Sequence, residues 1–297
     1  MIAPRLAGCF TALVTPFTRE GAVDEPALRK LVAWQLEQGV HGLVPVGSTG
    51  EAATMTVDER ARVVAITAEV AGGRVPVVAG AGGNDTRACI EWSARMVQAG
   101  ASHLLHVSPA YSKPPQRGLL AHYRAIADAA KKPVMLYNVP GRTASNMEAE
   151  TTLALAEHEN IVAVKEASGN LQQIGEIIRR RPEGFRVFSG DDALTLAVMA
   201  LGGDGIVSVI SNAVPRAMSQ LCEAMEQGDH GAARAIHRRL EPLMKAAFIE
   251  SNPIPIKAAV ALLGRCANVL RLPLVSLDAR HEPALRESLV QAGVSLA

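Results

Sequence analysis

The chain has 297 residues, of which 48% are hydrophobic, 20% are charged and 3% are aromatic, with 30 basic and 29 acidic side chains. The apolar content excludes an intrinsically disordered chain, and the balanced charge with few aromatic rings argues against a nucleic-acid-binding protein. No apolar stretch approaches the roughly 20 residues needed to span a bilayer, so we expect no membrane segment.

The cysteines and the first apolar run bear on the cellular compartment. The four cysteines are far apart and form no CxxC pair, which is typical of a reducing compartment and argues against zinc. Residues 6–9 match the lipobox of a lipoprotein signal, but the apolar run follows Cys9 instead of preceding it. We therefore interpret Cys9 as part of a first strand and expect a cytoplasmic protein.

Short apolar runs alternate with longer amphipathic segments over about two hundred residues, an organisation typical of α/β proteins. The predicted strands cover residues 9–16, 42–46, 75–79, 103–107, 134–138, 161–165, 187–189 and 205–209. Their apolar positions are continuous, as in strands buried on both faces. Each return to the sheet needs a crossover, so the pattern predicts parallel pairing.

Helix starts between these strands have recognisable signals. Thr56 and Glu59 have the spacing of a capping box, in which each side chain satisfies a free amide of the other residue. Asn84 or Asp85 is expected to begin the next helix, and Asn170 a later one. These signals place a helix between successive strands.

The eightfold repeat predicts a (β/α)8 TIM barrel over residues 1–221, a length that suits a fold of typically about 250 residues. A doubly wound open sheet is the alternative, but residues 15–17, after the first strand, lack its phosphate-binding glycines. Residues 222–297 have no strand pattern and are expected to form a C-terminal helical region. We expect Pro253 and Pro255 to break its helical pattern.

Lys165 ends a buried strand at the carboxyl edge, where TIM-barrel active sites lie. Desolvation favours a neutral amine, and a neutral amine can form a Schiff base with a carbonyl substrate. The alternative is a structural lysine paired with a carboxylate such as Glu166. Tyr137, at the end of the neighbouring strand, can carry the protons that Schiff-base chemistry requires.

Further polar side chains follow other strands. Arg142 can hold a carboxylate through two parallel hydrogen bonds, although a surface salt bridge is the commoner role for such an arginine. Ser48 and Thr49 lie between two glycines, where backbone amides can approach an anion, although loop geometry alone also explains the glycines. Tyr111 follows the strand at residues 103–107.

No metal site is expected. His103 and His106 point to opposite faces of one strand and cannot share an ion. Asp191 and Asp192 could bind a cation, but acidic residues at such a position more often cap a helix.

Together these residues resemble the dihydrodipicolinate synthase/N-acetylneuraminate lyase family of Schiff-base aldolases. The resemblance runs nearly from end to end, through residues 47–51, 137–143, 164–170, 189–192 and 252–257. The lysine and tyrosine segments are specific in combination, whereas the glycine-containing segment alone would be weak.

The resemblance implies that Lys165 forms a Schiff base with pyruvate, without a further cofactor, and that Tyr137 passes protons. Ser48 takes the place of a threonine whose hydroxyl usually links two tyrosines. Tyr111 would be the second tyrosine, contributed by a neighbouring subunit across a dimer interface. Family members are commonly homotetramers built as dimers of dimers.

The resemblance also assigns substrate-binding roles. Thr49 would hold the pyruvate carboxylate, and Gly190 and Val207 match positions that line the pyruvate pocket. Arg142 matches an arginine that grips the carboxylate of aspartate semialdehyde and separates the synthases from the sialic-acid lyases. The implied reaction yields 4-hydroxytetrahydrodipicolinate for lysine and diaminopimelate synthesis.

Two alternatives share this scaffold: another pyruvate-dependent aldolase or dehydratase acting on a sugar acid, and a non-catalytic pyruvate-binding regulator. Lysine-inhibited family members use a histidine, a glutamate and a tyrosine to bind lysine. Val57, Ala88 and Ala110 occupy the matching positions here, while Asn84 remains. We therefore expect insensitivity to lysine.

Overall fold

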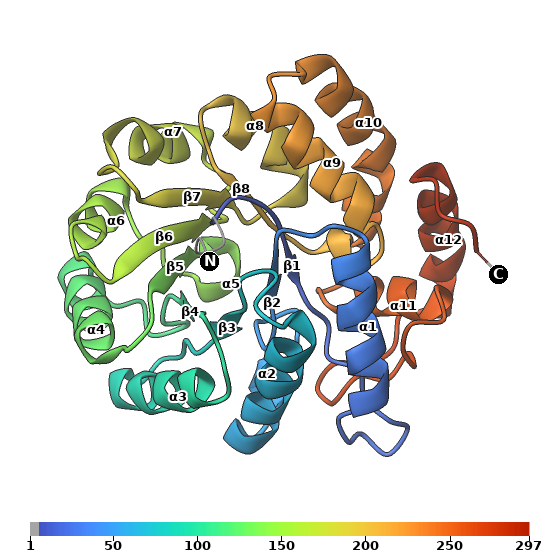
Figure 1. Ribbon diagram of the computed structural model, residues 1–297, viewed down its shortest axis with the longest axis horizontal. Helices are drawn as coiled ribbons and strands as arrows, with labels where there is room; N and C mark the ends of the chain where they lie inside the picture. The colour runs from blue at the N-terminus through green and yellow to red at the C-terminus, as the bar shows by residue number, and fades with distance from the viewer. Residues whose placement is uncertain (1–5, 297) are drawn as a thin grey trace.

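Eight parallel strands form a ring at the centre of the molecule, in a computed structural model that describes residues 6–296 (Figure 1). Hydrogen-bonded neighbours follow the order β2-β1-β8-β7-β6-β5-β4-β3, and a parallel bridge between Leu43 and Val77 joins the two ends. The strands are β1 (Gly8–Ala12), β2 (Gly42–Val44), β3 (Val78–Gly80), β4 (His103–Val107), β5 (Val134–Asn138), β6 (Ile161–Glu166), β7 (Arg186–Ser189) and β8 (Gly205–Ser208). The prediction of a (β/α)8 TIM barrel is confirmed.

Helices alternate with the strands and surround the ring (Figure 1). The helices are α1 (Glu25–Glu37), α2 (Val57–Ala71), α3 (Thr86–Gln98), α4 (Gln116–Ala129), α5 (Pro140–Thr143), α6 (Ala149–Ala156), α7 (Leu171–Arg180), α8 (Thr195–Ala200) and α9 (Pro215–Glu226). Short 3₁₀ turns cover Ala52–Thr54, Asp192–Leu194, Ile210–Asn212 and Ala279–His281.

The predicted helix starts are confirmed where a side chain can satisfy free amides. Thr56 and Glu59 form the expected capping box, and Asn170 accepts from two amides of the first turn of α7. At α3 the cap is Asp85. Asn84 instead accepts a hydrogen bond from the backbone nitrogen of Ala110, 2.8 Å away.

A strand ends earlier than predicted where the apolar run continues beyond the last residue that pairs with a neighbouring strand. The first strand ends at Ala12 instead of residue 16, although Leu13 and Val14 remain buried. Cys9 is fully buried within β1, which favours the strand interpretation over the lipobox. The lipobox match begins at Leu6, and residues 1–5 lie outside the described part of the chain.

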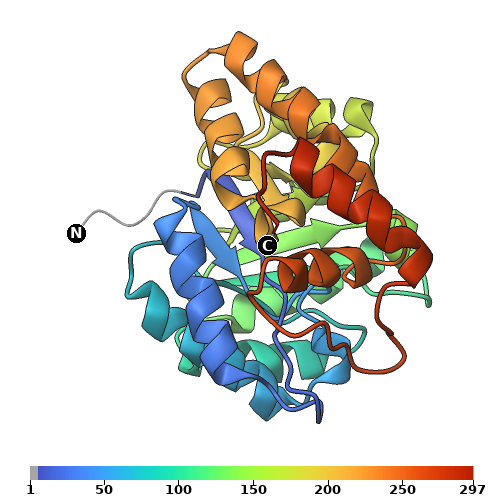
Figure 2. The same ribbon diagram turned by 90° about the vertical axis from the view of Figure 1, so that its right-hand side faces the viewer.

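The C-terminal helices α10 (His230–Ala246), α11 (Ile254–Leu262) and α12 (Glu282–Gln291) lie on one side of the barrel, which faces the viewer in Figure 2. Pro255 falls in the first turn of α11, where its missing N–H removes no helical hydrogen bond. The expected break in the helical pattern is confirmed, because α10 ends at Ala246 and α11 begins only at Ile254, between the two prolines.

One hydrophobic cluster joins the barrel to these helices. It contains Cys9 and Leu31 from the barrel together with Ile256 and Leu285 from the C-terminal helices. The predicted division between residues 221 and 222 falls inside α9. It remains a prediction, and residues 1–5 and 297 of the two predicted regions lie outside the described residues.

Candidate functional site

Lys165 lies on β6, directly opposite Tyr137 on β5. Its side chain is buried, and its amine lies 4.2 Å from the centroid of the Tyr137 ring. Both residues line a cavity of about 130 Å³. The parallel register therefore places a lysine amine and a phenol side by side, where both can reach the same small molecule.

The carboxylate of Glu166, the nearest one to Lys165 in the sequence, accepts hydrogen bonds from other residues. Successive strand residues face opposite sides, and the Glu166 carboxylate accepts from Asn138 Nδ2 at 3.0 Å, the Ser168 amide at 2.7 Å and Gln173 Nε2 at 3.2 Å. Burial raises the pKa of Glu166 above its ordinary value. Within residues 6–296, Lys165 makes no ion pair, and the pairing with Glu166 that was the structural alternative does not form.

The cavity is lined by side chains from several strand ends and from the C-terminal region: Ser48, Thr49, Tyr137, Val139, Arg142, Lys165, Ala167, Gly190, Asp191, Val209, Phe248 and Asn252. A Cβ added at Gly190 would lie 2.6 Å from the Ala167 side chain and 3.1 Å from Cε of Lys165. Glycine at this position therefore leaves room for the lysine side chain.

The guanidinium of Arg142 and the hydroxyl of Thr49 also line the Lys165 cavity, and both residues lie outside the strands. Arg142, on α5, donates from Nη2 to the backbone oxygen of Asn252 at 3.1 Å. Thr49 is buried, and its Oγ1 accepts a hydrogen bond from Asn252 Nδ2 at 2.9 Å. The Arg142 guanidinium and the Thr49 hydroxyl are hydrogen-bond donors that suit a carboxylate bound in the cavity.

Two residues expected at the site are not among those that line this cavity in the single chain. Tyr111 is 93% exposed, with a backbone φ of +69°, and its amide donates to the Thr143 oxygen at 3.0 Å. Val207 lies in the cluster inside the barrel that also contains Phe10 and Phe188, whereas Val209 lines the cavity. The single chain therefore does not bring Tyr111 to Lys165.

Sequence reasoning missed the contribution of Asn252 and Phe248. The segment 252–257 carries part of the family resemblance, but the sequence alone predicts no role for any of its residues. The overlooked signal was a polar Asn252 and a charged Lys257 flanking an otherwise apolar segment, which indicates specific buried partners.

A second cavity, of about 570 Å³, meets the first at Ser48 and Tyr137. Its wall includes Asn84, Ala88 and Arg60, whose guanidinium stacks 4.8 Å from the Trp92 ring centroid. Burial lowers the pKa of Arg60. Ala88, which lines this cavity, is one of the three residues on which the predicted insensitivity to lysine rests.

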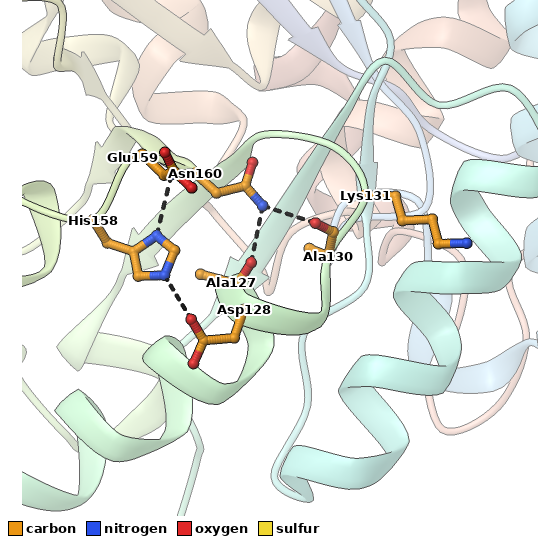
Figure 3. A pocket seen from close by; sticks show the side chains of 7 residues that line it. All are labelled: Ala127, Asp128, Ala130, Lys131, His158, Glu159 and Asn160. Carbon is orange, nitrogen blue, oxygen red and sulfur yellow. Dashed lines mark hydrogen bonds and ion pairs between the residues drawn. The ribbon is translucent and has the colours of Figure 1, made fainter.

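A third pocket, of about 470 Å³, is lined by residues just before β5 and β6, at the barrel end opposite Lys165. Figure 3 shows the side chains that line it. His158 Nε2 lies 3.0 Å from Asp128 Oδ1, and Asn160 Nδ2 donates to the Ala127 and Ala130 oxygens. These side chains hold a helix end against a strand start, a structural role typical of this end of the barrel.

The two aspartates after β7 act as hydrogen-bond acceptors for the backbone. Asp191 caps the 3₁₀ turn that follows it, and Asp192 accepts from Ser208 Oγ and from the amides of Val209 and Ile210. Burial raises the pKa of Asp192 to about 6. Among the described residues, no group of three or more His, Cys, Asp or Glu is arranged to hold a metal ion.

None of the helices in residues 6–296 combines the length and the apolar character required to cross a membrane.

A family model described as the dihydrodipicolinate synthetase family matches residues 5–292. The 4-hydroxy-tetrahydrodipicolinate synthase of Maridesulfovibrio salexigens is 47% identical over 288 residues, covering 97% of this chain and 98% of that protein.

Two solved structures are similarly close. The dihydrodipicolinate synthase of Aquifex aeolicus superposes with a TM-score of 0.95 at 41% identity, covering 98% of this chain and 99% of that one. The chloride-inhibited enzyme of Acinetobacter baumannii, complexed with pyruvate, gives a TM-score of 0.96 at 40% identity, covering 98% and 100%. The likeness includes the barrel and the C-terminal helices alike.

Proposed function

Since the chain belongs to the dihydrodipicolinate synthetase family, we propose that it is a lyase that condenses pyruvate with L-aspartate 4-semialdehyde. The product is 4-hydroxytetrahydrodipicolinate, an intermediate of lysine and diaminopimelate biosynthesis. Membership confirms the resemblance inferred from the sequence. Identity of 47% over nearly the full length of both chains supports the same reaction.

The observation that carries the proposal is the environment of Lys165. Its amine is buried, has no ion-pair partner among the described residues, and opens onto a cavity beside Tyr137. A lysine nitrogen that no carboxylate holds in an ion pair can approach a carbonyl carbon in the cavity and act as the nucleophile. Glu166 and Lys257 also have buried ionisable side chains, but neither residue lines this cavity.

The reaction begins when Lys165 Nζ attacks the ketone carbon of pyruvate and forms a carbinolamine. Loss of water, with a proton delivered to the departing oxygen, gives an imine; loss of a methyl proton then gives an enamine. The enamine carbon attacks the aldehyde carbon of the second substrate, whose oxygen takes up a proton, and the imine forms again. The amino group of the second substrate then attacks the imine carbon, which closes the ring and expels the Lys165 amine. The Tyr137 phenol lies where it can transfer these protons.

The remaining cavity residues suit the two substrate carboxylates. Thr49 supplies a hydroxyl beside the backbone amides of residues 47–51, which we call the glycine loop. Arg142 supplies a guanidinium that can grip the carboxylate of aspartate semialdehyde. Gly190 keeps the floor open for pyruvate next to Lys165. The Lys165 amine performs the covalent step, so we expect the enzyme to need no cofactor.

The working enzyme is proposed to be a cytoplasmic homotetramer built as a dimer of dimers. Tyr111 is exposed and has a positive φ, a conformation that costs energy for a tyrosine and is typical of functional positions. Ser48 is also exposed, at the mouth shared by the two cavities. A partner subunit that inserts its own Tyr111 beside Ser48 would complete the proton relay.

Subunit mixing tests this arrangement. Lys165→Met and Tyr111→Phe variants are each expected to be impaired, whereas subunit exchange between them should restore activity. Restoration is expected because one of the two sites in a mixed dimer then has both an intact lysine and an intact partner tyrosine. Exchange without restoration, or a fully active monomer, would contradict the shared site.

Substrate tests decide the reaction. The purified enzyme with pyruvate is offered aspartate semialdehyde, and in separate reactions is incubated with sialic acid or a sugar-acid substrate. We expect turnover with aspartate semialdehyde only, and a raised KM for that substrate in Arg142→Ala. Preferential turnover of a sugar acid would favour the alternative aldolase or dehydratase, and binding of pyruvate without turnover of any of them would favour a regulatory protein.

A further inference from the structure

Asn252 connects the two side chains proposed to hold the substrate carboxylates. It lies between α10 and α11, and its side chain lines the Lys165 cavity. Its Nδ2 donates to Thr49 Oγ1 at 2.9 Å, and its backbone oxygen accepts from Arg142 Nη2 at 3.1 Å. One buried residue from the C-terminal region therefore contacts both proposed anion-binding groups.

The direction of the Asn252–Thr49 hydrogen bond matters for binding. A threonine hydroxyl has one hydrogen to donate and lone pairs to accept with. Because the Asn252 amide donates to Thr49 Oγ1, the Thr49 hydrogen is not used in this contact. Within residues 6–296, Thr49 Oγ1 donates to no protein group, so its hydrogen can point into the cavity toward a carboxylate.

A buried ion pair fixes the segment that carries Asn252 against the glycine loop. Lys257 Nζ, on α11, lies 2.5 Å from Glu51 Oε1, and both side chains are fully buried. The other oxygen, Glu51 Oε2, accepts from the Arg271 amide at 3.1 Å. The glycine loop is thus joined to the C-terminal region at two points, Thr49–Asn252 and Glu51–Lys257.

We propose that Asn252 is a positioning residue that orients the Thr49 hydroxyl as a hydrogen-bond donor to the pyruvate carboxylate and steadies Arg142 beside it. The inference rests on the proposed function. It assigns to the C-terminal region a part in substrate binding at the barrel site, acting through Thr49 and Arg142.

A double-mutant cycle between residues 49 and 252 tests the proposal. Asn252→Ala and Thr49→Val are each expected to raise the KM for pyruvate about ten-fold, the scale of one hydrogen bond to a charged group, with a smaller change in kcat. In the double variant the KM should rise little beyond that of either single variant, because both changes remove the same donor. Additive effects would overturn the proposal.

Asn252→Asp is the near-isosteric variant and guards against misfolding. An ionised aspartate can only accept, so it would turn the Thr49 hydroxyl away from the substrate and repel the pyruvate carboxylate. We expect a larger rise in pyruvate KM than with Asn252→Ala, and the melting temperature of each variant is measured to show that the protein is folded. Ser251→Ala, at an exposed neighbouring position, serves as the matched control and should behave as wild type.

Borohydride reduction of the wild-type enzyme with pyruvate separates the two possible failures. If the wild type forms no adduct, the proposed function is wrong. If the wild type forms the adduct but Asn252→Asp has a wild-type KM for pyruvate, only the role of Asn252 is wrong.

Discussion

Two buried lysines in this chain have similar packing and different partners. Lys165 on β6 and Lys257 on α11 are both buried, and each amine lies over an aromatic ring, at 4.2 Å from Tyr137 and 4.1 Å from Phe17. Burial and contact with a ring therefore do not distinguish a reactive lysine from a structural one.

The difference lies in the counter-charge and the space in front of the amine. Lys257 is paired with Glu51 at 2.5 Å. Desolvation lowers the pKa of Lys257, while the attraction of Glu51 acts in the opposite direction. Lys165 has no ion-pair partner among the described residues and faces a cavity. A buried lysine with no ion-pair partner that faces a cavity indicates a nucleophile. A buried lysine that is paired with a carboxylate indicates a structural role.

The largest expected effect is on turnover, from substitution of Lys165. Lys165→Met removes the nucleophile and should lower kcat by about 10³-fold or more. The free energy of unfolding should change by less than about 1 kcal/mol, because a ring contact is lost but no ion pair is broken. Steady-state kinetics and urea unfolding measure the two effects, and retained turnover would contradict the assignment.

Substitution of Lys257 should have the opposite pattern, with a large effect on stability. Lys257→Met leaves the Glu51 carboxylate buried without its partner, at a cost of about 3–5 kcal/mol. Urea unfolding measures this loss.

The double variant Glu51→Gln/Lys257→Met is the control, and it should recover much of the stability because no unpaired charge remains. In both variants Lys165 should still react with pyruvate. A single variant as stable as wild type would show that the ion pair does not anchor the glycine loop.

Ser48→Ala tests the relay at the mouth of the cavity, with a smaller expected effect. Loss of the hydroxyl should slow turnover by about ten-fold or more, up to the roughly 10²–10⁴-fold that a general acid–base group typically contributes. Ser48→Thr is the conservative control and should retain turnover, since it keeps the hydroxyl. Wild-type turnover in Ser48→Ala would remove Ser48 from the relay.

The smallest expected effect is that of added L-lysine. Ala88 lines the second cavity without offering a carboxylate, and the Asn84 side chain is engaged with the Ala110 amide. We therefore predict no inhibition at sub-millimolar lysine. Ala88→Glu, which supplies a carboxylate, is the gain-of-function comparison; half-inhibition of the wild type in that range would contradict the prediction.

Features determined by residues that are close together in the sequence were predictable from it. The limits of β4 and β5 were predicted to the residue, since each strand is a short, mostly apolar and mostly buried run. The pairing of Lys165 with Tyr137 followed from the parallel order of adjacent strands, which fixes which ends meet.

Contacts between distant parts of the chain were not predictable in this way. Asn252 and Thr49 are 203 residues apart, and Lys257 and Glu51 are 206 apart. No local periodicity or capping signal specifies which loop a C-terminal helix will reach. The same limit applies to Tyr111, whose proposed partner belongs to another subunit.

Borohydride trapping with pyruvate, followed by peptide mass mapping, tests the contrast between the two lysines most directly. The reduced adduct should form on Lys165 alone, once per chain, while Lys257 remains unmodified. An adduct on Lys257, or no adduct at either lysine, would contradict the assignment of Lys165 as the Schiff-base residue.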